Sequence, residues 1–318
     1  MRCLVTGGGG FIGSNLVDRL LRNGHAVAAF DNFSTGQRQF LASAETFQNF
    51  TLHAGDLLDF EAICQAMRGV DVVFHLASNA DVRFGFEHPR KDLEQNTVAT
   101  FNVLEAMRRN GVYRIAFSSS GSVYGEPDTF PTPENVAFPI QTSLYGASKL
   151  AGESLIQAYC EGYGLQGYIF RFVSVLGERY SHGHVFDFYK RLRIKPTELT
   201  VLGDGRQRKS YLYIQDCIDA ILLAVERATT KLNIFNLGAD EYCEVNQSVE
   251  WITAHLRLNP KLTYTGGERG WIGDSPFIFL DCSKIRALGW RPKLSIHDGI
   301  IATLQYLQSN SWLLDARP

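Results

Sequence analysis

Residues 2–22, RCLVTGGGGFIGSNLVDRLLR, decide the fold of this chain. The stretch reads as a short apolar strand, a run of glycines and a helix with regularly spaced leucine and valine. In such a unit Gly7 permits the tight turn, Gly10 lets the backbone approach a pyrophosphate, and Gly13 lets the helix pack close to the strand. Phosphates would lie against the helix N-terminus, where free N–H groups and the dipole favour anions. The stretch therefore predicts a dinucleotide-binding turn.

A second predicted strand, residues 25–30, ends at Asp31, 18 residues after Gly13. A dinucleotide-binding fold places near this point a carboxylate that binds the adenosine ribose. Aspartate accepts hydrogen bonds from both ribose hydroxyls and repels a 2′-phosphate, so we expect NAD and not NADP as the cofactor. Asp31-Asn32 also suits a turn or a helix cap, but the position of Asp31 after the strand favours ribose binding.

Strand and helix continue to alternate after Asp31. We expect strands at 50–54, 71–76 and 113–117, and helices at 60–67 and 91–109. This alternation predicts an α/β fold with a doubly wound parallel sheet. Ligands of such a sheet bind beyond the carboxyl ends of the strands, where we place Asp56, Ala77 and Ser120. Asp56 either meets the adenine or only caps the helix that follows it.

Tyr145 and Lys149 are four residues apart, so on a helix both side chains leave the same face. A phenol titrates near pH 10, too high for a base at neutrality. A lysine ammonium about 5 Å away favours the phenolate by about two pKa units. Such a lysine would bring the pKa of Tyr145 into the working range of a base, but the spacing alone favours a chance pair on a helix over a site.

The pattern loosens in the second half of the chain. Four prolines punctuate a loop at 126–142, and a loop of this length is usually functional or mobile. A helix to about residue 163 and a strand at 166–173 follow it. Further predicted helices lie at 185–194, 213–227, 245–258 and 295–307, and further strands at 199–202 and 232–237. The expected organisation is a Rossmann-type NAD-binding domain at 1–175, with a return segment near 213–240, and a smaller C-terminal substrate-binding lobe at 176–318.

Composition excludes several classes of function. The 318 residues carry a net charge of −2 and are 45% hydrophobic, which favours a globular protein with no affinity for nucleic acid. No apolar run approaches a membrane span, and Met1-Arg2-Cys3 leads straight into the first strand, so we expect a cytoplasmic protein without a signal peptide. Six cysteines without paired spacing predict free thiols, and His182-Gly183-His184 alone predicts no metal site.

Motifs of one known family run along nearly the whole chain. They are Thr6-Gly7-x-x-Gly10-x-x-Gly13, Asp31-Asn32, Gly55-Asp56, His75-Leu76-Ala77, Asn96, Ser118-Ser119-Ser120, Val123-Tyr124-Gly125, Tyr145-x-x-x-Lys149, Phe170 to Gly177, Gly203-Asp204-Gly205, Ser210-Tyr211-Leu212-Tyr213 and Gly273-Asp274 through Asp281. In these motifs the chain resembles the extended short-chain dehydrogenase/reductases acting on nucleotide sugars. It is most similar to the UDP-glucose (UDP-galactose) 4-epimerases of the short archaeal type.

The resemblance implies roles for individual residues. Tyr145 would take the proton of a sugar hydroxyl, Ser120 would bond the same oxygen, and Lys149 would hold the nicotinamide ribose. The NAD-binding residues that it implies are Gly7, Gly10, Phe11, Ile12, Gly13, Asp31, Asn32, Asp56, Leu57, Leu76, Ala77, Asn96, Tyr145 and Lys149. The substrate-binding residues that it implies are Ser120, Ser122, Tyr145, Ser174, Arg208, Lys209, Arg269, Asp274 and Ile278.

Departures from the family pattern narrow the reaction and the substrate. Family dehydratases carry an Asp-Glu pair where Gly121 and Ser122 stand, and UDP-glucuronate decarboxylases keep a Glu at Ser122, so both activities are disfavoured. Lys209 and Trp271 stand where the family has arginines that bind the nucleotide, and Ser174 replaces an asparagine. Ile278, at the position that sets pocket size in the family, favours a plain hexose over an N-acetylated one.

The resemblance thus implies a UDP-sugar isomerase. The expected reaction is 4-epimerisation of UDP-glucose and UDP-galactose by transient oxidation at C4 and re-reduction on the opposite face. The alternatives are a sugar-nucleotide 4-ketoreductase or dehydrogenase, and an epimerase of UDP-glucuronate or UDP-N-acetylglucosamine. The resemblance also implies a homodimer formed through the helices near 97–109 and 149–163.

Overall fold

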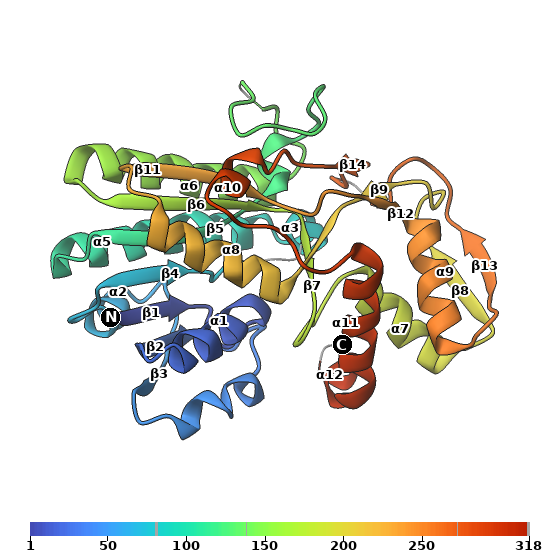
Figure 1. Ribbon diagram of the computed structural model, residues 1–318, viewed down its shortest axis with the longest axis horizontal. Coiled ribbons are helices and arrows are strands. Elements are labelled where there is room, and N and C mark those ends of the chain that lie inside the picture. Colours follow the sequence, from blue (N-terminus) through green and yellow to red (C-terminus); the bar gives the residue numbers. More distant parts are fainter. Residues whose placement is uncertain (80–81, 138, 272, 317–318) are drawn as a thin grey trace.

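The computed structural model describes residues 1–79, 82–137, 139–271 and 273–316. Within them, seven strands form one parallel sheet in the order β11-β6-β5-β4-β1-β2-β3 (Figure 1). This order, with its reversal between β1 and β4, is that of a dinucleotide-binding fold, so the predicted doubly wound sheet is confirmed. The strands are β1 (Arg2–Thr6), β2 (Ala26–Asp31), β3 (Phe50–Ala54), β4 (Val72–His75), β5 (Arg114–Ser120), β6 (Gln166–Phe172) and β11 (Leu232–Leu237).

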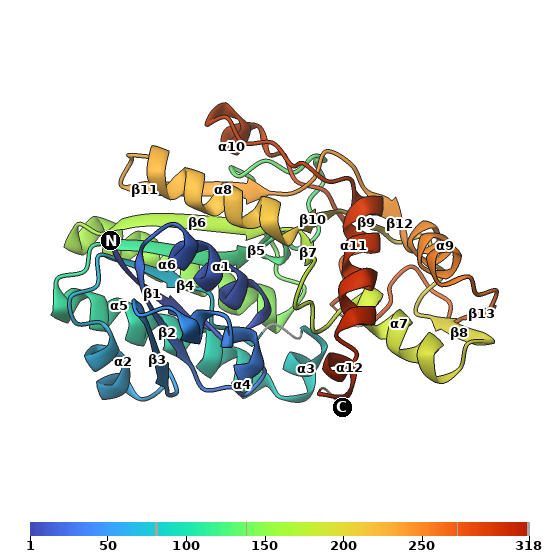
Figure 2. The same ribbon diagram turned by 60° about the horizontal axis from the view of Figure 1, so that its bottom comes forward.

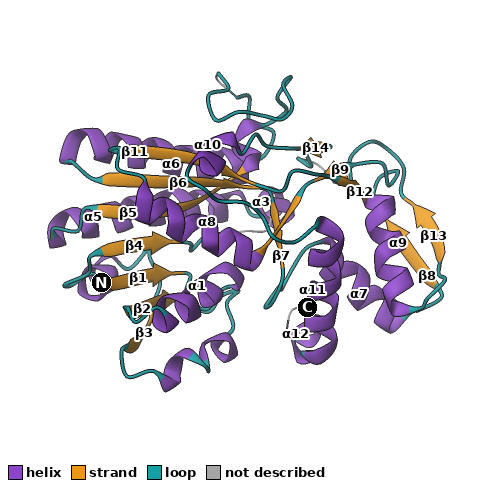
Figure 3. Ribbon diagram, viewed as in Figure 1, coloured by secondary structure: helices purple, strands orange, loops and turns teal. Residues whose placement is uncertain are grey.

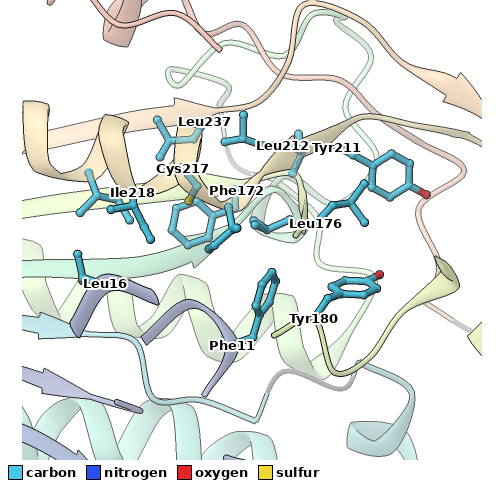
Figure 4. Close-up of a cluster of buried hydrophobic side chains, with 14 of the residues drawn as sticks. Phe11, Leu16, Phe172, Leu176, Tyr180, Tyr211, Leu212, Cys217, Ile218 and Leu237 are labelled. Carbon is cyan, nitrogen blue, oxygen red and sulfur yellow. The ribbon is translucent and has the colours of Figure 1, made fainter. Parts of the chain in front are cut away.

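Helices cover both faces of the sheet and create two hydrophobic cores. One core joins the sheet to α1 (Phe11–Arg22) and α8 (Ile214–Arg227) and continues into the second half of the chain. The other lies under α2 (Phe60–Ala66), α5 (Ala99–Asn110) and α6 (Leu144–Tyr163). Figure 4 shows the first core, where the rings of Phe11 and Tyr180 meet edge to face at a centroid distance of 5.6 Å.

Helix α6 has clear start and stop signals. The hydroxyl of Ser143 accepts a hydrogen bond from the Gly146 N–H, and this N-cap fixes the turn that carries Tyr145. At the other end Gly164 adopts a left-handed conformation with φ of 71°. The helix that carries the predicted tyrosine and lysine is therefore set by its own sequence.

The long helix expected at 91–109 is not regular. It consists of α4 (Pro89–Asp92), a π-helical turn (Leu93–Val98) and α5, and α3 (Val82–Glu87) precedes it. The π-helical turn contains Asn96. Turns of this kind are rare and often lie at functional sites.

The remaining elements form a smaller body at one end of the sheet (Figures 1 and 2). Its strands are short and pair over long distances in the sequence. They are β7 (Ser174–Leu176) with β10 (Tyr211–Tyr213), β8 (Glu198–Val201) with β13 (Lys261–Tyr264), and β9 (Arg208–Lys209) with β12 (Cys243–Glu244) and β14 (Phe277–Ile278). Its helices are α7 (His184–Ile194), α9 (Val245–Leu256), α11 (Ile296–Ser309) and α12 (Trp312–Asp315). The short helix α10 (Ser283–Ala287) instead packs against β11, and short 3₁₀ turns elsewhere span Arg38–Leu41, Ala44–Thr46 and Gly121–Tyr124.

The prolines of the segment after β5 lie in irregular structure, seen as loop above the sheet in Figure 3. Thr132 nevertheless forms a parallel bridge with Leu280. The six cysteines are free thiols, as expected. Across the described ranges, no helix combines the length and apolarity needed to cross a membrane.

Candidate active site

A cavity of about 810 Å³ follows the carboxyl edge of the sheet and extends into the smaller body. Its lining begins at the glycine turn and at the ends of β2, β4 and β5, continues over α6, and ends on α7 and the residues near Asp274. Most of the residues expected to bind cofactor or substrate contribute to this lining. Those residues are Gly7, Gly10, Phe11, Ile12, Gly13, Asp31, Asn32, Asp56, Leu57, Leu76, Ala77, Ser120, Ser122, Tyr145, Lys149, Ser174, Lys209, Asp274 and Ile278.

The glycine turn leaves no room for side chains where the helix meets the strand. Gly7 has a φ of 69°, and its N–H donates to the Phe30 carbonyl at 2.8 Å. A Cβ on Gly13 would lie 2.0 Å from the Gly7 carbonyl oxygen. Gly10 precedes α1 and offers no side-chain cap, so the N–H groups of the first turn are open to an anion.

Asp31, at the end of β2, lines the cavity beside the glycine turn. Its Oδ2 accepts from the Gly9 N–H at 2.8 Å and its Oδ1 from the Phe33 N–H at 2.7 Å. Burial raises the pKa of this carboxyl, and the two backbone hydrogen bonds act against the rise. Each oxygen keeps a further lone pair that can accept from a ribose hydroxyl. An uncapped helix N-terminus beside a buried carboxylate fits the pyrophosphate and ribose of NAD.

Asp56 does not cap α2, because Asp59 does so by accepting from the Ala62 N–H. Asp56 instead accepts from the Asn32 side chain at 2.8 Å and from the Leu58 N–H at 2.9 Å. Capping of α2, one of the two roles left open for Asp56, is therefore excluded. The Asp56 carboxylate links the loop after β2 to the loop after β3 at the cavity wall, and its contact with the adenine stays a prediction.

Ser120, Tyr145 and Lys149 converge where β5 ends against α6. The Tyr145 hydroxyl is hydrogen-bonded to Ser120. Ser120 Oγ also accepts from the Ser122 N–H and donates to the Ser122 hydroxyl, both at 3.1 Å. Lys149 is 1% exposed, and its Nζ donates to the Ser118 carbonyl at 2.8 Å. Phenol, hydroxyl and ammonium thus meet at one end of one strand.

The pKa values at this site correct our expectation for Tyr145. Burial raises the pKa of Tyr145 to about 12, while the bond to Ser120 lowers it. Burial also lowers the pKa of Lys149 to about 7, although Glu153 and Asp92 favour its charged form. Lys149 is therefore only partly charged near neutrality. The predicted lowering by a fully charged lysine is wrong for the chain alone, because burial raises the pKa of Tyr145 more than the bond to Ser120 lowers it.

The far end of the cavity combines charged and aromatic groups. Lys209 Nζ donates to Asp274 Oδ1 at 2.7 Å and to the Ser275 carbonyl, and it lies 5.9 Å from the centre of the Trp271 ring. Ser174 and Ile278 line the cavity between this end and Ser120. Much of the charge on Lys209 is consequently balanced by its own aspartate.

Comparison with known proteins gives the family. Residues 3–238 match the model of the NAD dependent epimerase/dehydratase family. The UDP-glucose 4-epimerase of Mycolicibacterium smegmatis is 32% identical over 328 residues, covering 98% of this chain and 100% of that protein. This chain belongs to the NAD-dependent epimerase/dehydratase family.

Solved structures agree in fold and in length. A crystal structure of a UDP-galactose 4-epimerase is 36% identical, has a TM-score of 0.88, and aligns over 98% of this chain and 100% of its own. The UDP-glucuronic acid 4-epimerase of Bacillus cereus, solved with UDP-glucuronic acid and NAD, is 27% identical with a TM-score of 0.90 and coverage of 98% and 100%. As a member of an NAD-dependent family whose relatives are solved with NAD, this enzyme uses NAD as its cofactor.

Three residues carried over from the family motifs lie outside the cavity lining. Asn96 is buried behind it, with its side chain bonded to the Ser148 hydroxyl at 2.8 Å. The Arg208 guanidinium stacks 4.0 Å from the centre of the Phe277 ring. Arg269 pairs with Glu126 and donates to the Asp274 carbonyl. In this structure each of the three side chains is held by another partner, and their contacts with cofactor or substrate stay predictions.

The lining also includes residues that the sequence motifs did not indicate. Lys91, Arg191 and Gln207 carry polar groups to it from separate elements. His184 also lines the cavity; its Nε2 is bonded to the Ser248 hydroxyl at 2.7 Å, and burial lowers its pKa to about 3. Among the described residues, no cluster of ligands could hold a metal ion.

Proposed function

We propose that this enzyme is a UDP-hexose 4-epimerase that interconverts UDP-glucose and UDP-galactose. The observation that carries the proposal is the meeting of Ser120, Tyr145 and Lys149 beside the glycine turn, without an additional carboxylate on the residues that directly follow Ser120. Similarity to UDP-glucose and UDP-galactose 4-epimerases along the full chain supports the choice of sugar.

The proposed chemistry assigns one proton transfer to each half-reaction. Tyr145 as phenolate accepts the proton of the sugar C4 hydroxyl, and the Ser120 hydroxyl donates to the same oxygen. When bound, NAD would supply the acceptor for the hydride that leaves the sugar C4 and the source of the hydride for re-reduction. Tyr145 then gives the proton back to the oxygen of the 4-keto sugar. Lys149, whose ammonium lies 5.9 Å from the Tyr145 ring centre, stabilises the phenolate whenever it is charged.

The turn after Ser120 argues against related reactions of the family. Gly121 is buried, and a Cβ there would lie 3.1 Å from Ile278 Cγ2 and 3.2 Å from the Phe172 carbonyl oxygen, so a larger side chain would have to displace its neighbours. Ser122 bonds to Ser120 and carries no acid. Elimination of water from the sugar requires a second acid and base, and neither residue supplies one.

An epimerase of UDP-glucuronate is the second candidate, favoured by the similarity to the Bacillus cereus enzyme. A 4-ketoreductase or dehydrogenase on the same site would need to exchange its cofactor in each turnover. Purified enzyme incubated with UDP-glucose and no added NAD distinguishes these possibilities. We expect UDP-galactose to form, whereas product only from UDP-glucuronate, or only with added NADH, would select another candidate.

Tyr145→Phe tests the role of the phenol. The variant keeps the ring and loses only the hydroxyl, so we expect normal folding, retained NAD and a loss of at least about a hundredfold in kcat. Circular dichroism and the NAD content of the purified protein are the controls. Near-normal turnover in this variant would contradict the assignment of Tyr145 as the acid and base.

Three further parts of the proposal concern the whole protein. We place the cofactor domain at 1–175 and the substrate lobe at 176–318, with α8 and β11 as the return segment. A homodimer through α5 and α6 is supported by apolar side chains exposed on this side, with Phe101 45% and Tyr163 52% exposed. A cytoplasmic location is supported by six free thiols, which a reducing compartment preserves.

A further inference from the structure

Three buried side chains lie between the glycine turn and the helix that carries the catalytic tyrosine. Thr6 ends β1, His75 ends β4, and Thr100 lies in the first turn of α5. All three are 0% exposed. Burying a polar group lowers the stability of the fold unless the group is hydrogen-bonded. We therefore expect every polar side-chain atom of these three residues to have a hydrogen-bond partner inside the protein.

The three side chains are bonded in series. Thr6 Oγ1 lies 2.7 Å from His75 Nδ1, and His75 Nε2 lies 3.0 Å from Thr100 Oγ1. The Thr100 hydroxyl donates to the Asn96 carbonyl at 2.5 Å. At the other end, Thr6 Oγ1 accepts from the Ala77 N–H at 3.4 Å.

Counting protons fixes the direction of this series. Thr100 has one hydroxyl proton and gives it to the Asn96 carbonyl, so Thr100 Oγ1 accepts from His75 and Nε2 carries a proton. Burial, together with nearby Lys149, lowers the pKa of His75 to about 3, so the ring is neutral and Nδ1 is bare. Nδ1 then accepts the hydroxyl proton of Thr6. Every donor is used once, and the bonds all point toward the π-helical turn.

The two ends of the series belong to the two halves of the site. Ala77 packs against the glycine turn, since a Cβ on Gly7 would lie 2.7 Å from the Ala77 nitrogen. Asn96 donates to the Ser148 hydroxyl at 2.8 Å, and Ser148 donates to the Tyr145 carbonyl at 2.8 Å. The chain of bonds thus runs from the cofactor turn through the sheet to the backbone of the catalytic tyrosine.

We propose that Thr6, His75 and Thr100 are positioning residues that fix the π-helical turn, and through Asn96 and Ser148 the catalytic Tyr145, relative to the glycine turn that holds the cofactor. The proposal rests on the proposed epimerase function. It assigns His75 no proton transfer to substrate; the imidazole acts as a neutral spacer with one donor and one acceptor. A small displacement of a reacting group lowers the reaction rate more than it weakens substrate binding. A displacement near 1 Å can lower the rate about a hundredfold.

The matched pair Thr100→Val and Thr100→Ser tests this proposal. Valine keeps the shape of threonine and removes both the acceptor for His75 and the donor to Asn96, whereas serine keeps the hydroxyl. We expect T100V to lose about tenfold or more in kcat for UDP-hexose epimerisation, with KM and NAD content changed less than about threefold, and T100S to stay within about threefold of the parent. A residue needed only for stability would lower the melting temperature of T100V without lowering kcat per folded molecule, and that result would overturn the proposal.

Nitrogen NMR of histidine gives a readout that does not depend on activity. The signals of His75 are assigned as those missing from the spectrum of His75→Asn. We expect His75 to be fixed as the neutral Nε2–H tautomer in the parent and in T100S, and to lose this preference in T100V. A fixed Nδ1–H tautomer in the parent would refute the chain. If the parent had no epimerase activity, the proposed function would fail while the tautomer result still decided the chain. If T100V did not fold, Thr6→Val would break the same chain at its other end, with the same expected loss in kcat. His75 should keep the Nε2–H tautomer in that variant, because Thr100 still accepts from Nε2.

Discussion

The hydroxyl of Ser120 is the group that opposes the effect of burial on Tyr145. Its bond stabilises the phenolate, so removing it raises the pKa of Tyr145 further. A base with a higher pKa is deprotonated only at higher pH, and the acidic limb of the profile of kcat/KM against pH moves upward. We therefore expect Ser120→Ala to shift this limb to higher pH and to lower kcat by about tenfold or more.

Ser120→Thr is the matched control, because threonine keeps the hydroxyl at the end of β5. Its acidic limb should coincide with that of the parent enzyme. The profile should be followed with UDP-glucose from about pH 6 up to the highest pH at which the parent enzyme stays folded. An unchanged limb in S120A would show that Ser120 does not tune Tyr145.

The sequence predicted which residues meet at the site better than it predicted their chemistry. A spacing of four on a helix was sufficient to place Tyr145 and Lys149 on one side of α6. Their pKa values depend on burial by β5 and its neighbours, which no local spacing encodes. Spacing also does not encode where Arg208 and Arg269 point, since the direction of a long side chain follows its partner, here an aromatic ring and Glu126.

A buried ion pair joins α6 to β6 directly behind the site. Arg171 donates to Glu153 through Nε at 3.0 Å and through Nη2 at 2.7 Å, and the Glu153 side chain is 0% exposed. Ser119 of β5 also donates to Glu153. Removing one partner leaves the other charge buried, which typically costs about 3–5 kcal/mol. We expect Arg171→Met to lose stability on this scale in urea unfolding.

An exposed pair supplies the control for this prediction. Lys231 and Glu161 are 2.9 Å apart with side chains 54% and 81% exposed, so Lys231→Met should cost no more than about 1 kcal/mol. Replacing both members of the buried pair, as in R171M with Glu153→Gln, should restore part of the loss. If R171M matched K231M, the buried pair would not stabilise the fold.

Substitutions at two glycines of the glycine turn distinguish a side chain that disturbs the fold from one that only blocks the cofactor. A Cβ on Gly13 meets the Gly7 carbonyl at 2.0 Å, so Gly13→Ala must displace the turn itself. A Cβ on Gly10 meets only the same carbonyl oxygen, at 3.1 Å, and otherwise points into the space expected for the pyrophosphate. We expect G10A to fold and to lose most of its bound NAD, and G13A to be unstable as well, as measured by NAD content and melting temperature.

Elements with a strong period were predicted from the sequence, whereas those made by long-range pairing were not. The glycines and the helical spacing of the apolar residues at 2–22 predict the strand, the turn and the helix of this segment. β9, β12 and β14 have two residues each and exist only because distant segments pair. The π-helical turn at Leu93–Val98 was missed because one additional residue in a turn hardly changes the hydrophobic period.

At the scale of the whole molecule, the side of the enzyme formed by α5 and the π-helical turn carries exposed apolar side chains. Leu93 is 56%, Val98 38% and Phe101 45% exposed. If this side forms the proposed dimer interface, Phe101→Glu buries a charge in it and should yield monomers in light scattering. Ile194, 78% exposed at the end of α7, provides the control, since Ile194→Glu should leave the mass unchanged. A monomeric parent enzyme would contradict the proposed dimer interface.

The edge strand β11 has a consequence for how this family can recombine. It pairs with β6 but is encoded after α7, β8 and α8, within the portion of the gene that also builds the far end of the cavity. Asn236 of β11 accepts from the Tyr124 hydroxyl and donates to the carbonyls of Thr132 and Asp281, so three further segments are matched to this strand. A single genetic crossover after β6 would take both β11 and the far end of the cavity from the second parent, while β6 came from the first. We therefore expect working chimeras of relatives to exchange 176–231 as an inner block, with β6 and β11 inherited from one parent.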